Sequence, residues 1–326
     1  MTTRQSLRDN AFRSVFIHAL ITGACAAVFF AAAVSVFAEE SGKPGLLILT
    51  HGAPSPKWQE SIKDIAARTA KLNEAKGAFH AVTAANMEFA QPDAAEGVRT
   101  LEKAGCDRII VVPAFIGHTS HTHFDVPASL GLYSSPSVRK TMELEKVKPA
   151  APKVPVTVTQ PLCDGDVLDK YVKDEIAALS ENPADEAVLL LAHGDEQYAG
   201  LFEPVMRRLL IEAAGSKGIT VGDWLCCGMG ESWNREVAPV IRKMAKDRKR
   251  VIVIGFYLVS SAKSISRAGE RRGPARPAGG TANETAGPER ERRAPLEGID
   301  VRFSERGVIE HPYVPQWILQ SASEAL

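Results

Sequence analysis

Residues 111–127 have the sequence V-V-P-A-F-I-G-H-T-S-H-T-H-F-D-V-P, in which an apolar run leads directly into three histidines and an aspartate. Residues 109–112 are β-branched without interruption, a pattern typical of a parallel strand that is covered on both faces. Gly117 marks the point at which the backbone leaves this strand. The stretch therefore predicts an open α/β sheet whose histidines follow the carboxyl end of a strand, where such sheets bind ligands.

Three of the eight histidines of the chain, His118, His121 and His123, fall within this one loop. Imidazole is the commonest metal-ligating side chain, and it titrates near physiological pH. The cluster therefore predicts a metal site, a proton-transfer site or both. The alternative interpretation is a polar surface loop whose histidines are hydrogen-bonded and have no chemical role.

On both sides of this loop, apolar runs that predict strands alternate with amphipathic segments that predict helices. The expected strands are residues 46–50, 79–87, 109–112 and 154–159, and the expected helices are residues 57–72, 92–103 and 167–179. Residues 130–153 contain too few apolar residues in register to predict an element, and we interpret them as an excursion over the site.

The pattern then restarts, which indicates an internal duplication. Residues 187–194, A-V-L-L-L-A-H-G, repeat the L-L-I-L-T-H-G of residues 46–52, and residues 251–258 repeat residues 109–116 after the same interval. The sequence therefore predicts an α/β fold of two similar doubly wound lobes, each with a flavodoxin-like parallel sheet covered by helices.

The second copy lacks the glutamate and the loop histidines that follow the second and third strands of the first. Residues 259–266, which follow its third strand, contain no histidine. Where the first copy has M-E-F-A at residues 87–90, we align C-C-G-M at residues 226–229. The metal site is therefore expected in the first lobe.

The first residues of the chain resemble an export signal. A start with Arg4, Arg8 and Arg13 precedes an apolar run, and V-F-A at residues 36–38 resembles a small-residue cleavage site. We expect export to the periplasm; an uncleaved anchor formed by residues 14–38 is the alternative, because the run is long enough to span a bilayer. The predicted organisation is a signal peptide or membrane anchor at 1–38, an N-terminal lobe with the metal site at 39–165, and a degenerate C-terminal lobe at 166–326 with a disordered insertion at 270–295.

The composition and the motifs give no sign of a nucleic-acid or nucleotide partner. Lys and Arg number 39, as do Asp and Glu, and aromatic residues make up only 6% of the chain, so no nucleic-acid partner is expected. No glycine-rich phosphate-binding motif stands at a strand-to-helix turn, so no nucleotide is expected either. The cysteines beyond the leader, Cys106, Cys163, Cys226 and Cys227, are interpreted as small buried apolar side chains.

Three neighbouring strands deliver polar side chains to one edge of the predicted sheet. His51 follows the first strand, Glu88 follows the second, and the histidine loop follows the third. Because adjacent strands lie about 5 Å apart, these side chains can converge. Two imidazoles and a carboxylate suit an open site for Co²⁺, Fe²⁺, Ni²⁺ or Zn²⁺. Insertion of a metal into a nitrogen macrocycle needs such a site together with a base for the pyrrole protons.

These motifs resemble the class II tetrapyrrole chelatases, specifically the sirohydrochlorin cobaltochelatases of anaerobic cobalamin biosynthesis. The resemblance rests on the first His-Gly, on E-F-A-Q-P at 88–92, on V-P-A-F-I at 112–116, and on a histidine four residues before D-V-P at 125–127. It implies a lyase-type metal chelatase with Co²⁺ and sirohydrochlorin or a related tetrapyrrole as substrates. In this family two histidines and a glutamate bind the metal and take the protons at the mouth of a cleft between the lobes. The resemblance implies that His51, Glu88 and His121 have these roles here.

The chain departs from the family pattern at several positions. Thr119 stands where a glycine is usual, and the first motif reads T-H-G-A at 50–53 where the family often has Gly-His-Gly-Ser. His118 and His123 are additional histidines, so the sequence leaves open which imidazole binds the ion.

Other roles are open for single residues. His51 could belong to a tight turn, Glu88 could cap the helix that follows Pro92, and Asp125 is expected to orient an imidazole or cap a helix. His193 and the residues up to 196 could line the other wall of the cleft.

Two further functions remain open at this point. One is a periplasmic carrier that binds a metal ion or haem on the chelatase fold without turning it over, which the export signal favours. The other is a ferrochelatase or nickel chelatase on the same scaffold, because ligand type alone does not select the ion. The sequence also leaves open whether the chain forms a homo-oligomer.

Overall fold

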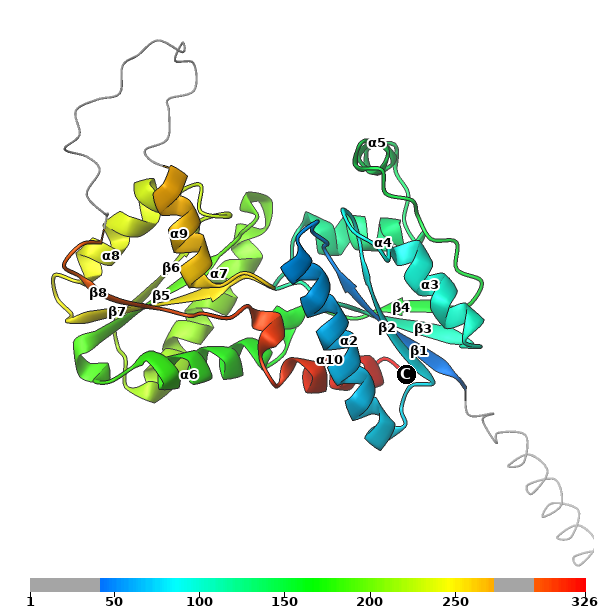
Figure 1. Cartoon of the computed structure of the whole chain (residues 1–326), viewed down its shortest axis with the longest axis horizontal. Coiled ribbons are helices and arrows are strands. Elements are labelled where there is room, and N and C mark those ends of the chain that lie inside the picture. Colours follow the sequence, from blue (N-terminus) through cyan, green and yellow to red (C-terminus); the bar gives the residue numbers. More distant parts are fainter. Residues whose placement is uncertain (1–41, 273–295) are drawn as a thin grey trace, which may run out of the picture. The chain divides into compact units, whose positions relative to one another are not determined.

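The computed structural model describes residues 42–272 and 296–326, and it contains two four-stranded sheets whose neighbouring strands are all parallel (Figure 1). The first sheet has the order β2-β1-β3-β4 and the second has the order β6-β5-β7-β8. The first contains β1 (Pro44–Thr50), β2 (Ala81–Asn86), β3 (Arg108–Pro113) and β4 (Val156–Val158), and the second contains β5 (Glu186–Ala192), β6 (Gly222–Cys226), β7 (Arg250–Phe256) and β8 (Asp300–Phe303). The repeated order confirms the predicted fold of two similar doubly wound lobes.

Helices cover both faces of each sheet (Figure 1). The first lobe contains α2 (Pro56–Lys76), α3 (Ala94–Lys103), α4 (Val126–Ser129) and α5 (Pro136–Glu145). The following part of the chain contains α6 (Val167–Leu179), α7 (Ala199–Arg208), α8 (Ala238–Met244), α9 (Ala262–Arg272) and α10 (Val314–Ser323). Strand β1 is buried along its whole length, and its alternate residues enter two different apolar clusters. This two-sided burial explains the uninterrupted apolar runs in the sequence.

Residues 130–153 differ from the expectation because they include the helix α5. Ser135 begins it by accepting a hydrogen bond from the backbone N–H of Val138 at 3.3 Å, and Pro136 occupies the first turn. Met142 is the only buried residue of this helix. With one buried residue, this helix has no apolar periodicity by which it could be predicted. The Ser135-Pro136 pair at its start is the one helix signal that the sequence offers.

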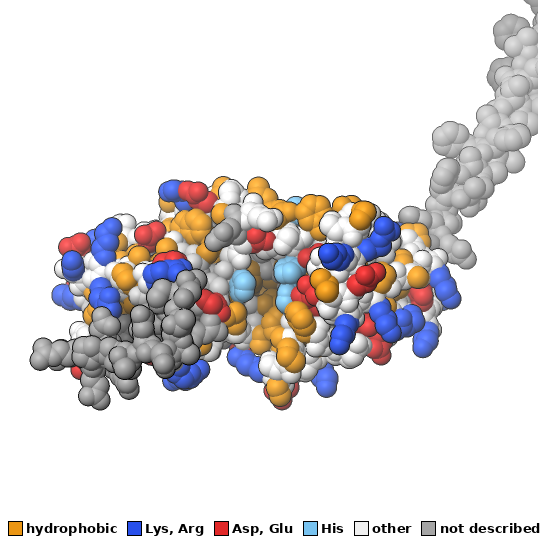
Figure 2. Space-filling view, turned by 90° about the horizontal axis from the view of Figure 1, so that it is seen from above, with side chains coloured by type: hydrophobic (Ala, Val, Ile, Leu, Met, Phe, Trp, Pro, Cys, Tyr) orange, Lys and Arg blue, Asp and Glu red, His pale blue; other side chains and the backbone are white. Residues whose placement is uncertain are grey.

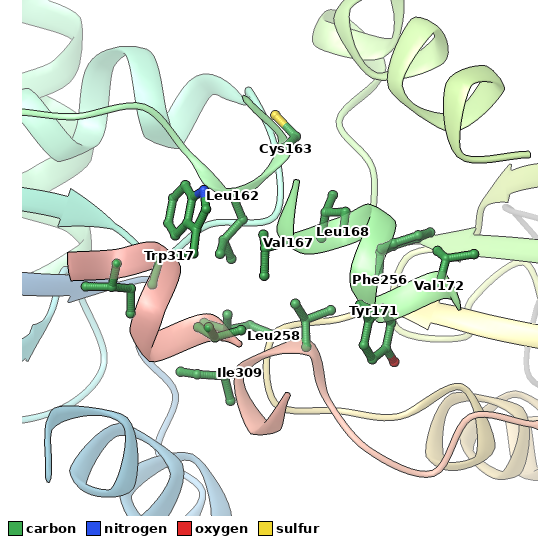
Figure 3. Packing of buried hydrophobic residues seen from close by; sticks show 14 of the residues in the cluster. Leu162, Cys163, Val167, Leu168, Tyr171, Val172, Phe256, Leu258, Ile309 and Trp317 are labelled. Atoms are coloured by element: carbon green, nitrogen blue, oxygen red, sulfur yellow. The ribbon is translucent and has the colours of Figure 1, made fainter. Parts of the chain in front are cut away.

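One apolar cluster joins residues of both lobes, which belong to a single compact unit at residues 43–326 (Figure 3). It includes Leu162, Val167 and Leu258 together with Trp317 of α10. Helix α10 packs against α2 and β3, so the last helix of the chain covers the first lobe. The predicted boundary between the lobes at 165/166 stays a prediction. Helix α10, which the prediction assigned to the second lobe, packs on the first.

Parts of the predicted organisation lie outside the described residues. The signal peptide or anchor at 1–38 is one of them. Of the predicted insertion at 270–295, residues 270–272 complete helix α9, and the remainder is not described. Within the two described ranges, no helix has both the length and the apolar character needed to cross a bilayer.

Candidate metal site

The structure brings together the three residues that the sequence selected as metal ligands. His51 follows β1, Glu88 follows β2, and His121 lies in the loop after β3. One candidate ligand atom from each residue lies within 4.8 Å of the other two. The Nε2 atom of His51 is 2.8 Å from Oε1 of Glu88, and the rings of His51 and His121 are 4.7 Å apart. The predicted convergence is confirmed, and the role of these residues as metal ligands stays a prediction.

The backbone around His51 fixes this geometry. The N–H of Glu88 donates to the carbonyl of His51 at 2.9 Å, so β1 and β2 remain paired beyond their last strand residues. Gly52 has φ 104°, and a Cβ atom there would lie 1.8 Å from the carbonyl oxygen of Glu88. Only glycine fits after His51, because any side chain would push the two ligand-bearing segments apart.

His121 is held by the residue that the sequence suggested for this purpose. Residues His121–Asp125 form one π-helical turn, a form of backbone that occurs often at functional sites. The Nδ1 atom of His121 is 2.7 Å from Oδ2 of Asp125. If Nδ1 donates this hydrogen bond, Nε2 keeps its lone pair for a metal ion, which is the usual arrangement of a metal-ligating histidine.

The imidazole of His51 faces an oxygen atom at each of its nitrogens. Nδ1 lies 2.9 Å from the carbonyl oxygen of Gly52, and Nε2 faces Glu88. Burial alone would lower the pKa of His51, but the hydrogen bonds to Glu88 and Gly52 and the charge of Glu88 outweigh it and raise the pKa. A proton or a divalent cation between His51 and Glu88 satisfies both groups, so the two compete for one position.

The two additional histidines have other partners. The Nε2 atom of His118 is 3.0 Å from Oδ1 of Asp164. The ring of His123 stacks on His118 and on Tyr198, with 5.2 Å between centroids in each case. His121 is therefore the member of the histidine loop that joins His51 and Glu88.

Glu88 does not cap the helix that follows Pro92. Asp93 occupies that position, and its side chain accepts a hydrogen bond from the backbone N–H of Glu96 at 2.8 Å. Glu88 is only 5% exposed and faces His51. A buried carboxylate needs a charged or hydrogen-bonding partner, and His51 supplies it.

Sequence reasoning missed Glu145, the last residue of α5. Burial, the charge of Glu88 and a hydrogen bond to Glu88 raise the pKa of Glu145, and Asp125 adds to this effect, while His121 opposes it. These interactions place the Glu145 carboxyl beside the site. The sequence contained no local signal for it, because Glu145 lies in the polar segment without an apolar pattern.

The structure corrects the alignment of the two lobes by one residue. Thr50 pairs with Asn86 in the first sheet, and Ala192 pairs with Cys226 in the second. The N–H of Gly228 donates to the carbonyl of His193, as Glu88 does to His51. The counterpart of Glu88 is therefore Gly228 and not Cys227, because the backbone pairing, which the sequence letters do not reveal, sets the register.

A cavity of about 580 Å³ adjoins the site, and residues of both lobes line it. Figure 2 shows histidine side chains on both sides of the hollow. His51 and His121 lie in one wall and His193 in the other, as the sequence suggested, and much of the lining is apolar. Examples are Phe89, Phe115, Phe202, Met229 and Val259. No Lys or Arg belongs to the lining formed by the described residues.

Ser120 ties the histidine loop to the second lobe. Its backbone N–H and its Oγ atom each donate to Oδ2 of Asp195 at 3.1 Å. Asp195 belongs to the wall that carries His193. The loop with His121 is therefore positioned from both sides of the cavity.

Several known proteins similar to this chain are chelatases or members of a chelatase family. The model of the CbiX family matches residues 45–179. A sirohydrochlorin cobaltochelatase of Methanococcoides burtonii is 30% identical over 132 residues, which are 40% of this chain and 93% of the relative. That of Methanopyrus kandleri is 33% identical over 87 residues, 27% of this chain and 58% of the relative. The chain thus spans under two thirds of the length of several curated relatives.

Solved structures support the fold across both lobes. SirB from Bacillus subtilis with Fe³⁺ has a TM-score of 0.57 at 14% identity, covering 86% of this chain and 95% of that protein. The sirohydrochlorin chelatase SirB from Bacillus subtilis subspecies spizizenii, in complex with cobalt, has a TM-score of 0.52 at 14% identity, with coverages of 86% and 94%. At this identity the likeness shows the fold alone.

Proposed function

We propose that this chain, which belongs to the CbiX family of class II tetrapyrrole chelatases, inserts Co²⁺ into sirohydrochlorin. One observation carries the proposal: His51 and His121, which line a largely apolar cavity, converge with the buried Glu88. Curated relatives are named sirohydrochlorin cobaltochelatases, which supports this pair of substrates.

The site suits an ion that must be bound and then released. Two imidazoles and one carboxylate leave coordination positions open, and the macrocycle nitrogens can occupy them while the ion is still held. Asp125 keeps His121 in one orientation, so the ligand is in place before the ion arrives. The apolar walls can hold the face of a flat ring and exclude water from it.

Insertion of a divalent ion releases two protons from the pyrrole nitrogens of the macrocycle. His51 is placed to accept a proton on Nε2 when the ion leaves that atom, because Glu88 stabilises the imidazolium. Glu145 is an exposed residue, and its carboxyl group interacts with Glu88. It therefore offers a path for the proton from the buried pair to solvent.

The choice of Co²⁺ rests on the named relatives rather than on the ligands. An N₂O ligand set accepts Fe²⁺, Ni²⁺ and Zn²⁺ as well. We also propose, from residues 1–38, that the protein acts in the periplasm, either free or anchored through residues 14–38.

One observation favours a second candidate, a carrier of haem or a related porphyrin. Sirohydrochlorin carries many carboxylates, whereas the described cavity lining contains Asp195 and no Lys or Arg. A macrocycle with few carboxylates fits such a wall at a lower desolvation cost. The carrier would bind its cargo without forming a metallated product.

The two candidates are separated by turnover. Sirohydrochlorin is mixed with Co²⁺, with and without catalytic amounts of the purified chain, and its absorption spectrum is followed. More than one metallated product per protein chain supports the chelatase. Binding that stops at one equivalent, with no product released, contradicts it and favours the carrier.

A further inference from the structure

A second group of potential ligands lies outside the site described above. One candidate ligand atom from each of His118, Cys163 and Asp164 lies within 4.8 Å of the other two. The Oδ1 atom of Asp164 is 3.0 Å from Nε2 of His118 and 3.5 Å from Sγ of Cys163. In a tetrahedral site with bonds of about 2.0–2.3 Å, ligand atoms lie roughly 3.3–3.8 Å apart. The distances from Asp164 to His118 and to Cys163 are therefore close to the ligand spacing around one ion.

The fold positions this group as it positions the first. His118 follows β3, and Cys163 and Asp164 lie in the 3₁₀ turn Leu162–Asp164 after β4. Figure 3 shows the sulfur of Cys163 pointing away from Leu162 and Val167. Cys163 is only 2% exposed and belongs to the apolar cluster, and its Sγ atom lies 3.5 Å from Oδ1 of Asp164. This orientation is not required of a cysteine that serves only as a small apolar residue.

We propose that His118, Cys163 and Asp164 form a second binding site for a borderline divalent ion such as Co²⁺ or Zn²⁺. The site offers an imidazole nitrogen, a thiolate and a carboxylate oxygen, and it leaves a fourth position open. It differs from the His51–Glu88–His121 site by the thiolate, which binds such ions more strongly than an oxygen ligand does.

Binding at this site releases the thiol proton. Burial and then the charge of Asp164 raise the pKa of Cys163 to about 12, so the metal-free residue is a thiol. The ion replaces the thiol proton, which passes to solvent, and a neutral His118 binds the ion through Nε2 with its own proton moved to Nδ1.

The position of His118 suggests a use for the second site. His118 and His121 line the same cavity. If the proposed chelatase activity holds, the thiolate site collects the ion and the His51–Glu88–His121 site, which lacks a thiolate, passes it to the macrocycle. The thiolate site then binds the ion tightly, and the site without a thiolate releases it easily.

Cobalt binding tests the proposal without any tetrapyrrole. Co²⁺ is titrated without oxygen into the full chain carrying Cys25→Ser, which removes the cysteine of the leader. Absorption in the near ultraviolet reports thiolate-to-cobalt charge transfer, and equilibrium dialysis counts the bound ions. We expect two ions per chain and a charge-transfer band. Cys163→Ser should lose the band and one ion, whereas His51→Ala should lose one ion and keep the band.

Cys226→Ser is the matched control, because Cys226 lines the cavity and does not belong to the proposed group. It should keep the band. Absence of the band in the Cys25→Ser chain, or its persistence in Cys163→Ser, overturns the second site. If circular dichroism shows that Cys163→Ser is unfolded, His118→Gln replaces it and should also lose one ion. A band without chelatase turnover contradicts the proposed function alone, and turnover without a band contradicts the second site alone.

Discussion

The two lobes share a scaffold and differ in what they place on it. Each has a parallel sheet of the same strand order, and in each the first strand ends in a His-Gly turn. His51 Nδ1 lies 2.9 Å from the carbonyl of Gly52, and His193 Nδ1 lies 3.1 Å from that of Gly194. The turn is therefore a feature of the fold and does not by itself make a site.

The difference begins one strand further along. The position opposite the histidine is Glu88 in the first lobe and Gly228 in the second, and residues 259–266, which directly follow the third strand of the second lobe, contain no histidine. His51 consequently has a buried carboxylate at its Nε2 atom, whereas His193 is exposed. Among the described residues, the two copies thus share a scaffold, while the converging His51, Glu88 and His121 belong to the first copy alone.

The sharpest test of this comparison removes equivalent histidines. His51→Ala and His121→Ala should each lower the rate of metallation by more than about 100-fold, since loss of a ligand exceeds the effect of losing its outer support. His193→Ala, the matched change in the second lobe, should cause a much smaller loss. Initial rates from absorption spectra measure all three, with thermal unfolding as the control for folding. Complete loss in His193→Ala would move the site to the other wall.

A smaller effect is expected when the support of His121 is removed. Asp125→Asn leaves the ring in place but weakens the hydrogen bond that fixes Nδ1, so affinity for Co²⁺ should fall by about 10- to 100-fold. Asp174→Asn is the matched control, because Asp174 pairs with His311 outside the candidate site. Equilibrium dialysis gives both affinities. Equal affinities in the two variants would show that Asp125 does not position His121.

The two glycine turns can be compared directly. Gly52 and Gly194 both have positive φ, and a Cβ would meet the carbonyl oxygen of Glu88 at 1.8 Å or Sγ of Cys226 at 2.4 Å, respectively. Each change to alanine should lower the free energy of unfolding by about 1–3 kcal/mol. Only Gly52→Ala should also weaken Co²⁺ binding, because it displaces Glu88. Denaturant unfolding and dialysis, run on both variants, separate the two effects.

The smallest effect concerns a histidine paired with a carboxylate for structural reasons. His311 is 2% exposed, and burial together with the charge of Arg306 lowers its pKa, although Asp174 opposes this. Below the ordinary value of about 6.5, the unfolded chain binds a proton that the folded chain does not. The free energy of unfolding should therefore fall as the pH drops from about 7 to 5, by about 1 kcal/mol or less.

His311→Asn should flatten this part of the stability profile, because the side chain that titrates is gone. Denaturant unfolding at several pH values measures the slopes. An unaltered slope in His311→Asn would assign the pH dependence to another group.

The sequence predicted the features that depend on local pattern. The parallel sheets followed from uninterrupted apolar runs, and the two lobes followed from the repeated strand with its His-Gly turn. The convergence of His51, Glu88 and His121 followed because neighbouring parallel strands end at the same edge of a sheet. Each of these inferences uses the period of the strands and their order, which the letters contain.

The remaining features depend on contacts between distant segments. Glu145 reaches Glu88 from a helix with one buried residue, so no pattern announced it. Glu88 and Gly228 hold equivalent positions in the two lobes, as the backbone pairing shows. The two sequences align more simply with a shift of one residue, so the sequence alone hides this equivalence. The hydrogen bond between His118 and Asp164 joins the ends of β3 and β4, and no sequence pattern distinguishes His118 from His121 in this respect.

Helix α10 has a consequence for the order in which the molecule can be completed. It is the last helix in the chain, yet it covers α2 and β3, which are among the first elements to be synthesised. The first lobe therefore has an uncovered apolar face until residues 314–323 are available. Synthesis from the N-terminus therefore cannot complete the packing of the lobe that contains His51, Glu88 and His121 before residues 314–323 have been made.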